Sequence, residues 1–366
     1  MVKHTLFLVH GMGRHEGTQW SDEVWEKLVE CSERYPHFRT KKKLAEYAEP
    51  VPVGYDEFLR AALRRWDEQA TTFGAFAQTN DLRQADSLDW LAGVSGDGAG
   101  FLLSHVADVV IYRFFAHEAG RIQDVLKERI FSEVARKQAL DADAKFSVMA
   151  HSLGTSVVHD ALAEMGGLEH IDGDVNTFSA AHFRFDSIHL LANVSRLLQT
   201  KPKAYASVVR PGPRSTAGRY CGKMYCHRHE LDPFLKPKPF EPVTWGRDFE
   251  LANLRHYRGW NVHGWLHYLD HPMVHVPLLK SITKSSAVTP KQEREAVGDY
   301  PRFGADLQNV AAAQAKLAEL QALAQDVDEE QDLKGNFDAL MGMWSALKDL
   351  RDLTGASWQA LEGSVA

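Results

Sequence analysis

The chain has 366 residues, of which 44% are hydrophobic and 25% charged, enough for one large core with an appended smaller unit. A formal net charge of −7 argues against nucleic acid as the main partner. No run of about 18 uncharged apolar residues occurs, so the sequence predicts no transmembrane segment.

The first predicted element is the apolar run in "HTLFLVHGMGRHEG", which is typical of a buried strand. It is too short for the apolar core of a signal peptide, and three cysteines are an odd count, so we expect a reduced, cytoplasmic protein.

Gly11 and Gly13 follow the strand and allow a sharp turn that aims the Met12 N–H inward. His10 and Gly11 are candidate binding residues. A phosphate loop is disfavoured, because the G-x-G-x-x-G spacing and the P-loop lysine are missing.

The stretch "FSVMAHSLGTSVVHDAL" starts like a short buried strand and continues with the spacing of a helix. Ser152 stands at the corner, and Ala150 and Gly154 are small enough for the two backbones to approach. A serine there is exposed as a nucleophile, and the Leu153 N–H is available at the helix start as an oxyanion donor. His151 is a further candidate binding residue. The alternative is that the serine only caps the helix.

Together, "FLVHGMG" and "VMAHSLGT" resemble the α/β-hydrolase superfamily, in particular bacterial serine hydrolases of lipase or esterase type, over roughly residues 4–280. The resemblance implies a mostly parallel, doubly wound α/β sheet with a Ser-His-Asp triad. It also implies that the acid and then the histidine follow the nucleophile in sequence, each in a loop after a strand. Ala150 stands where the family pattern has its first glycine, which exchanges one small residue for another.

Only one aspartate after the nucleophile directly follows a strand-like stretch. In "KMYCHRHELDPFLKPKPF", Asp232 follows the strand-like part, and the next residue, Pro233, stiffens the loop. Asp172 and Asp174 lie in a polar connection, and Asp186 precedes an apolar run instead of following it. Asp232 is therefore the candidate acid, and the alternative is a turn-forming Asp-Pro pair.

The candidate base lies in "RHYRGWNVHGWLHYLDHPMVHVPLL", after the strand-like stretch "FELANLRHY". His263, which a glycine follows, is best placed in the loop, and His267 is the alternate base because it falls near a helix start. His271 and His275 flank Pro272 and are expected on a helix surface. A base in this loop would titrate near neutrality.

The cluster "CGKMYCHRH" could suggest zinc binding through Cys221, Cys226, His227 and His229. Its spacing is not C-x-x-C, and alternation along a strand would point the two cysteines to opposite faces. We therefore expect no metal site and no cofactor.

Six strands are predicted with helices between them, which indicates a parallel sheet covered on both sides. They lie near residues 4–10, 47–54, 145–150, 187–193, 222–229 and 249–257. These strands belong to a predicted hydrolase domain over 1–282, with an insertion over about 56–116 that could cover the site as a lid or be a plain surface excursion.

The character of the sequence changes after residue 282. A polar stretch with two prolines over 283–303 is predicted as a linker, and apolar residues at helical spacing over 304–366 predict a helical hairpin. The hairpin would pack on the hydrolase domain or on a second copy, giving a homodimer.

The sequence therefore predicts an enzyme that cleaves a carboxylic ester, with a small-molecule or lipid acyl ester as its substrate. Three other enzyme activities, thioesterase, amidase and acyltransferase, would use the same residues. The alternative from another class is a non-catalytic scaffold or binding protein that keeps the fold.

Overall fold

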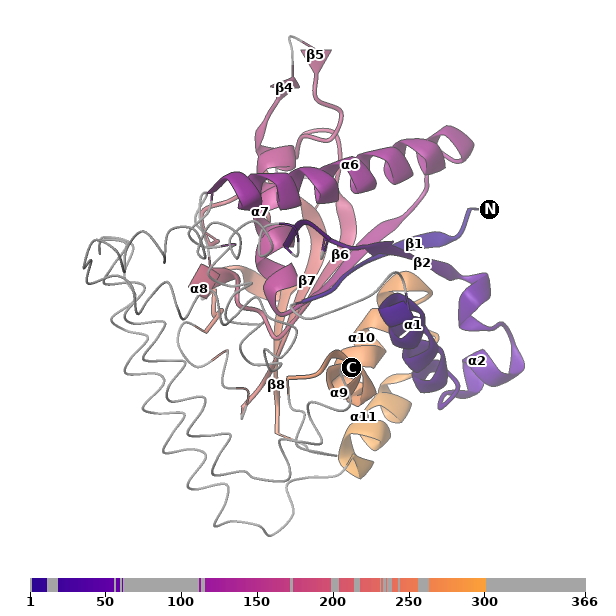
Figure 1. Ribbon diagram of the computed structural model, residues 1–366. Helices are drawn as coiled ribbons and strands as arrows, with labels where there is room; N and C mark the ends of the chain where they lie inside the picture. Colours follow the sequence, from indigo (N-terminus) through magenta and orange to yellow (C-terminus); the bar gives the residue numbers. More distant parts are fainter. Residues whose placement is uncertain are drawn as a thin grey trace, which may run out of the picture.

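The computed structural model describes residues 2–11, 19–55, 57–59, 61, 112, 116–171, 174–198, 204–213, 218–230, 232, 235, 239–242, 244–255 and 263–300. The predicted hairpin over 304–366 and most of the predicted insertion over 56–116 lie outside these residues. Figure 1 shows a central sheet with helices on both sides.

The sheet has six parallel strands in the order β2-β1-β3-β6-β7-β8. They are β1 (His4–Val9), β2 (Ala48–Val53), β3 (Phe146–His151), β6 (Phe185–Leu191), β7 (Cys221–His229) and β8 (Phe249–Leu254). All six predicted strands are confirmed, with ends within three residues of the prediction. The central strands β1 and β3 are buried along their whole length, as expected for a sheet covered on both faces.

Two groups of helices cover the sheet (Figure 1). On one face lie α6 (Ala116–Leu140), α7 (Leu153–Gly167) and the short α8 (Ser195–Leu198). On the other lie α1 (Gln19–Ser32), α9 (Trp265–Asp270), α10 (Pro272–Ile282) and α11 (Pro290–Asp299). Smaller elements are α2 (Pro36–Thr40), η1 (Leu44–Glu46), η3 (Gly246–Asp248) and a small antiparallel pair, β4 (His170–Ile171) with β5 (Asp174–Val175).

The chain changes direction across the sheet between β1 and β3. From β1 it moves outward to the edge strand β2, and β3 then returns to the other side of β1. Crevices at the carboxyl ends of such strands are where open α/β sheets bind ligands. The two predicted motifs end β1 and β3, which are parallel neighbours, so this topology brings them to the same edge of the sheet.

The predicted linker over 283–303 is partly wrong, because it contains the helix α11. Thr289 begins this helix with a capping box: its side chain accepts from the Gln292 N–H, and the Gln292 side chain accepts from the Thr289 N–H. Pro290 occupies the first turn, where its missing N–H costs nothing. A salt bridge between Lys280 and Glu293 joins α11 to α10. The packed domain therefore continues at least to residue 300.

The prediction that His271 and His275 lie on a helix surface is also wrong, since both are buried. The Nδ1 of His275 is 2.8 Å from the Leu269 carbonyl oxygen and its Nε2 is 2.8 Å from the Tyr35 hydroxyl. Burial lowers the pKa of His275 to about 4, so its ring is neutral at pH 7.

Within the described part of the chain, no helix is long and apolar enough to cross a membrane.

Candidate active site

Ser152 occupies the corner between β3 and α7 in a strained backbone conformation. Its φ of 52° and ψ of −128° are unusual for a residue with a side chain and cost about 1–3 kcal/mol. The surrounding hydrogen bonds hold this conformation: the Ser152 N–H donates to the Leu191 carbonyl at 3.0 Å, and the Thr155 N–H donates to the Ser152 carbonyl at 2.9 Å. The geometry is that of a sharp strand-to-helix turn with the serine at its tip.

The small residues around the corner are required by close backbone contacts. A Cβ on Gly154 would lie 2.2 Å from the His10 carbonyl oxygen and 2.8 Å from that of Val9. A Cβ on Gly11 would lie 2.7 Å from the Cβ of Ser152. The loop after β1 therefore passes directly against the elbow, as the sequence motifs predict.

Three predicted residues from distant parts of the sequence form one chain of hydrogen bonds. His263 Nε2 is 2.9 Å from Ser152 Oγ, and His263 Nδ1 is 2.8 Å from Asp232 Oδ2. A carboxylate only accepts, so Nδ1 carries a hydrogen in this arrangement and the neutral ring accepts the serine O–H at Nε2. The exposed fractions are 1% for Ser152, 0% for Asp232 and 9% for His263.

Asp232 is held in a turn just beyond the end of β7, where its N–H donates to the His229 carbonyl at 3.0 Å. The hydroxyl of Tyr268 donates to Asp232 Oδ2 at 3.0 Å and accepts the His229 N–H at 2.9 Å. Burial, followed by the negative charge of Asp232, raises the pKa of Tyr268 well above its usual value, so the hydroxyl remains a donor. This contact could not be predicted from the sequence, where the only signal is a tyrosine near the predicted base.

His267, the alternate base, lies on α9 and packs against another histidine. Its ring centroid is 5.6 Å from that of His229, with the rings nearly perpendicular. Burial, together with the neighbouring His229, lowers the pKa of His267 to about 4. Of the two candidates, His263 is the one within hydrogen-bond distance of Ser152.

The two predicted oxyanion donors differ in what the structure describes. Leu153 is the first residue of α7, where a helix leaves its N–H groups without an intrahelical acceptor. Met12 lies outside the described residues. Gly11 ends the described part of its loop beside Ser152.

His10, a predicted binding residue, lies inside the core. Its ring is fully buried between Tyr55, at a centroid distance of 4.8 Å, and Trp20, at 4.7 Å. Its Nδ1 is 2.5 Å from the Gly11 carbonyl oxygen, and the Tyr55 hydroxyl donates to the His10 carbonyl at 2.7 Å. The side chain therefore supports the loop from inside the core. His151, the third predicted binding residue, is buried under α9.

The cysteine and histidine cluster lies on β7, as predicted, with its side chains alternating between the two faces of the strand. All three cysteines of the chain are free and buried, and burial raises the pKa of Cys226 to about 12. Among the residues described, no three His, Cys, Asp or Glu side chains are arranged to hold a metal ion.

A second serine-histidine-aspartate set, which no sequence motif predicted, joins His159 and Asp160 in the middle of α7 to Ser207. His159 Nε2 is 2.9 Å from Ser207 Oγ, and His159 Nδ1 is 2.9 Å from Asp160 Oδ1. The Tyr112 hydroxyl donates to Asp160 at 2.8 Å. Ser207 differs from Ser152 because it follows no strand-to-helix corner, and its Oγ already accepts the Val209 N–H at 3.3 Å. This set links α7 to residues 204–213.

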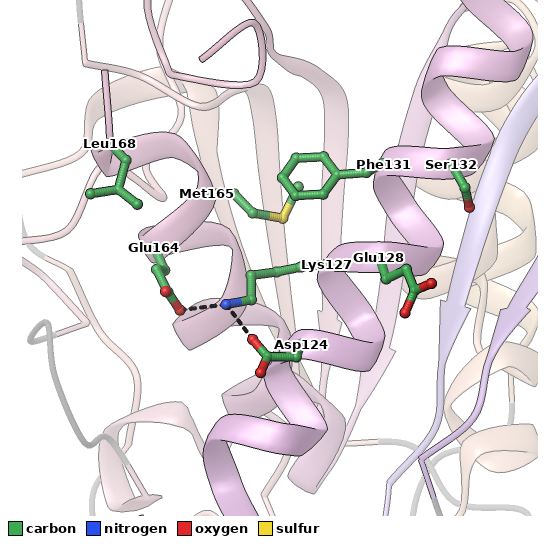
Figure 2. A pocket seen from close by; sticks show the side chains of 8 residues that line it. All are labelled: Asp124, Lys127, Glu128, Phe131, Ser132, Glu164, Met165 and Leu168. Carbon is green, nitrogen blue, oxygen red and sulfur yellow. Dashed lines mark hydrogen bonds and ion pairs between the residues drawn. The ribbon is translucent and has the colours of Figure 1, made fainter. Parts of the chain in front are cut away.

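A hollow of about 580 Å³ lies elsewhere, on the outer surface of α6 and α7 (Figure 2). Lys127 crosses it and forms ion pairs with Asp124 at 2.7 Å and Glu164 at 2.8 Å. The residues that line it do not include Ser152 or its partners. The hydrogen-bonded residues at the elbow, and not this hollow, are therefore the candidate site.

Comparison with known proteins gives little beyond this geometry. No protein-family model matches the sequence, and no curated protein does. An uncharacterized protein from Pseudomonas aeruginosa has a solved structure that matches with a TM-score of 0.32 and 8% sequence identity. The match covers 92% of this chain and 56% of that one, so this chain spans just over half of its length. So weak a likeness supports no statement about fold family or function.

Proposed function

We propose that the protein is a serine hydrolase of the α/β-hydrolase type that cleaves a carboxylic ester. The observation that carries the proposal is the hydrogen-bonded chain from Ser152 through His263 to Asp232, which starts at a strained strand-to-helix corner. The order of the three residues in the sequence is serine, aspartate, histidine, the order of that superfamily. The parallel sheet with the site at the carboxyl ends of β1, β3 and β7 is compatible with the same fold.

The mechanism follows from the positions of these groups. His263 Nε2 takes the proton of Ser152 as Oγ attacks the acyl carbon, and the Leu153 N–H, at the start of α7, stabilises the oxyanion. Met12 N–H is the proposed second donor. The tetrahedral intermediate collapses to an acyl-serine, and the departing alkoxide takes the proton from His263.

Hydrolysis of the acyl-serine reverses these proton transfers. His263 takes a proton from a water molecule, whose oxygen attacks the acyl carbon, and then returns a proton to Ser152 as the carboxylic acid leaves. Asp232 holds the ring in the required tautomer and stabilises its charged form. These steps use side chains, backbone N–H groups and water, and we propose that no cofactor takes part.

A fluorophosphonate probe tests the proposal, because it reacts with a serine only when an assembled triad activates it. We expect the wild-type protein to be labelled at Ser152 and to hydrolyse p-nitrophenyl esters. Ser152→Ala should abolish labelling and lower hydrolysis by about a thousandfold or more.

Ser207→Ala is the matched control. It removes a buried serine that contacts a His-Asp pair of the same kind but does not stand at an elbow. Labelling and hydrolysis should remain at the wild-type level. A wild-type protein that is folded but neither labelled nor hydrolytic would contradict the proposal and favour a non-catalytic scaffold.

The leaving group and acyl chain are a second question for the same assay. Oxygen esters, thioesters and anilides of one acyl group separate an esterase from a thioesterase or an amidase, and an alcohol acceptor in place of water detects acyl transfer. We propose an ester, either small or of lipid type, and p-nitrophenyl esters of increasing length would define the acyl chain.

A further inference from the structure

We propose that His151, the residue before the nucleophile, is a positioning residue that clamps the loop of the base. This inference rests on the proposed function. It assigns His151 a different role from the substrate contact that the sequence suggested.

The clamp is a short hydrogen bond to the backbone of the base itself. His151 Nε2 lies 2.6 Å from the carbonyl oxygen of His263. A carbonyl oxygen only accepts, so Nε2 carries a hydrogen and donates it. The bond fixes the peptide group that follows His263, and with it the direction in which the imidazole leaves the backbone.

The ring of His151 is also held in place by α9. Its centroid is 5.4 Å from that of Trp265 with the rings stacked, and 6.1 Å from that of Tyr268. Tyr268 is the residue whose hydroxyl binds Asp232. The ring therefore packs against the helix that follows the base, and only 8% of the residue is exposed.

The same ring lies beside the loop after β1. A Cβ on Gly11 would be 3.1 Å from His151 Nδ1, so the loop backbone passes over the ring edge. His151 is bonded covalently to Ser152, by hydrogen bond to His263, and by packing to the proposed oxyanion loop. One side chain thus joins the three segments whose relative positions decide the chemistry, and a misplacement of about 1 Å among them can cost about a hundredfold in rate.

Two substitutions separate the hydrogen bond from the packing. His151→Phe keeps a flat ring against Trp265 and loses the donor, whereas His151→Gln places an amide N–H near the original Nε2. We expect the phenylalanine variant to lose about 10- to 100-fold in kcat for a p-nitrophenyl ester, with KM within about twofold of wild type. The glutamine variant should recover at least about tenfold of that loss.

A third measurement tests whether the effect passes through the base. In a His263→Ala background there is no imidazole to position, so adding His151→Phe should leave the residual hydrolysis unchanged. Thermal unfolding of each variant shows whether it folds. The proton resonance of the His263 Nδ1–H, which shifts downfield when it bonds to Asp232, should broaden or move in the phenylalanine variant and return in the glutamine variant.

The outcomes distinguish this inference from the proposed function. A rise in KM at unchanged kcat would show that His151 binds substrate, and equal rates for all three proteins would show that the clamp has no effect; either result overturns the inference while wild-type labelling stands. If the wild type itself is not labelled, the proposed function fails. The Nδ1–H resonance then decides whether His151 positions His263.

Discussion

Gly154→Ala is expected to disturb the elbow more than its size suggests. The added Cβ would lie 2.2 Å from the His10 carbonyl oxygen and 2.8 Å from that of Val9. Both are backbone atoms of β1 and its loop, so neither can rotate away as a flexible side chain would. Ordinary contacts between carbon and carbonyl oxygen are about 3.3–3.6 Å, so α7 and β1 must separate by about 1 Å.

The free energy of unfolding should fall by about 2 kcal/mol. Overpacking a core costs about 1–3 kcal/mol, and rigid backbone neighbours place this site at the upper end. Alanine gains at most about 1 kcal/mol over glycine from its helix propensity, which offsets part of the cost. At about 2–4 °C per kcal/mol for a domain of this size class, Tm should fall by about 4–8 °C.

The loss of activity should be larger than the loss of stability alone would cause. Ser152 moves with α7, whereas Asp232 and His263 belong to other segments. A displacement of about 1 Å corresponds to a loss of about a hundredfold in kcat/KM for a p-nitrophenyl ester. Gly167→Ala is the matched control, since an added Cβ there has no atom within 4 Å. It should keep full activity and leave Tm unchanged or raise it slightly. A Gly154→Ala protein with wild-type Tm and activity would refute the close approach of α7 and β1.

Two further tests follow: a substitution probes the loop beside the site, and a change of pH probes the buried histidines of the core. Tyr55→Phe removes the 2.7 Å bond to the His10 carbonyl but keeps the stacked ring, so fluorophosphonate labelling should slow several-fold with little change in Tm; an unchanged labelling rate would mean that this bond does not position the loop. Burial lowers the pKa of His4 to about 4 and of His227 to about 3, against about 6.5 in the unfolded chain. The unfolded chain therefore takes up protons first as the pH falls. The free energy of unfolding, measured by urea titration, should be level above about pH 6.5 and fall between about pH 6.5 and 4, by at most about 1.4 kcal/mol per pH unit for each such group. Stability that rises on acidification over this range would contradict the neutral burial of these rings.

The strands and the three central residues of the site could be predicted because their signals are local. A buried parallel strand is a short apolar run, and the residues after it lie at one edge of the sheet. Asp232 and His263 were therefore chosen by their positions after strands, in the order that the family resemblance implies, with His267 as the alternate base. The elbow at Ser152 was marked by small residues on both sides. The capping residues at Thr289 were equally local, but the polar composition around them led to the prediction of a linker.

The contacts that the sequence could not predict join residues far apart in the chain. Tyr268 reaches Asp232 because α9 lies close to the end of β7, where the Tyr268 hydroxyl also accepts the His229 N–H. Histidine is a polar residue type, which favours the surface, yet His10, His271 and His275 are buried. Aromatic side chains and carbonyl groups from other segments contact them in the folded protein. The deciding interactions were therefore tertiary, and no periodicity or motif reports them.

The helix α1 contacts both the loop after β1 and the helix α9, which follows the proposed base. The ring of Trp20, at the start of α1, is 4.7 Å from that of His10 in the loop after β1 and 5.6 Å from that of Trp265 at the start of α9. Two residues beyond the other end of α1, Arg34 forms a salt bridge with Asp270, the last residue of α9. Because α1 contacts both this loop and α9, a change that loosens its packing should lower the rate of labelling at Ser152 even when the sheet and the elbow remain folded.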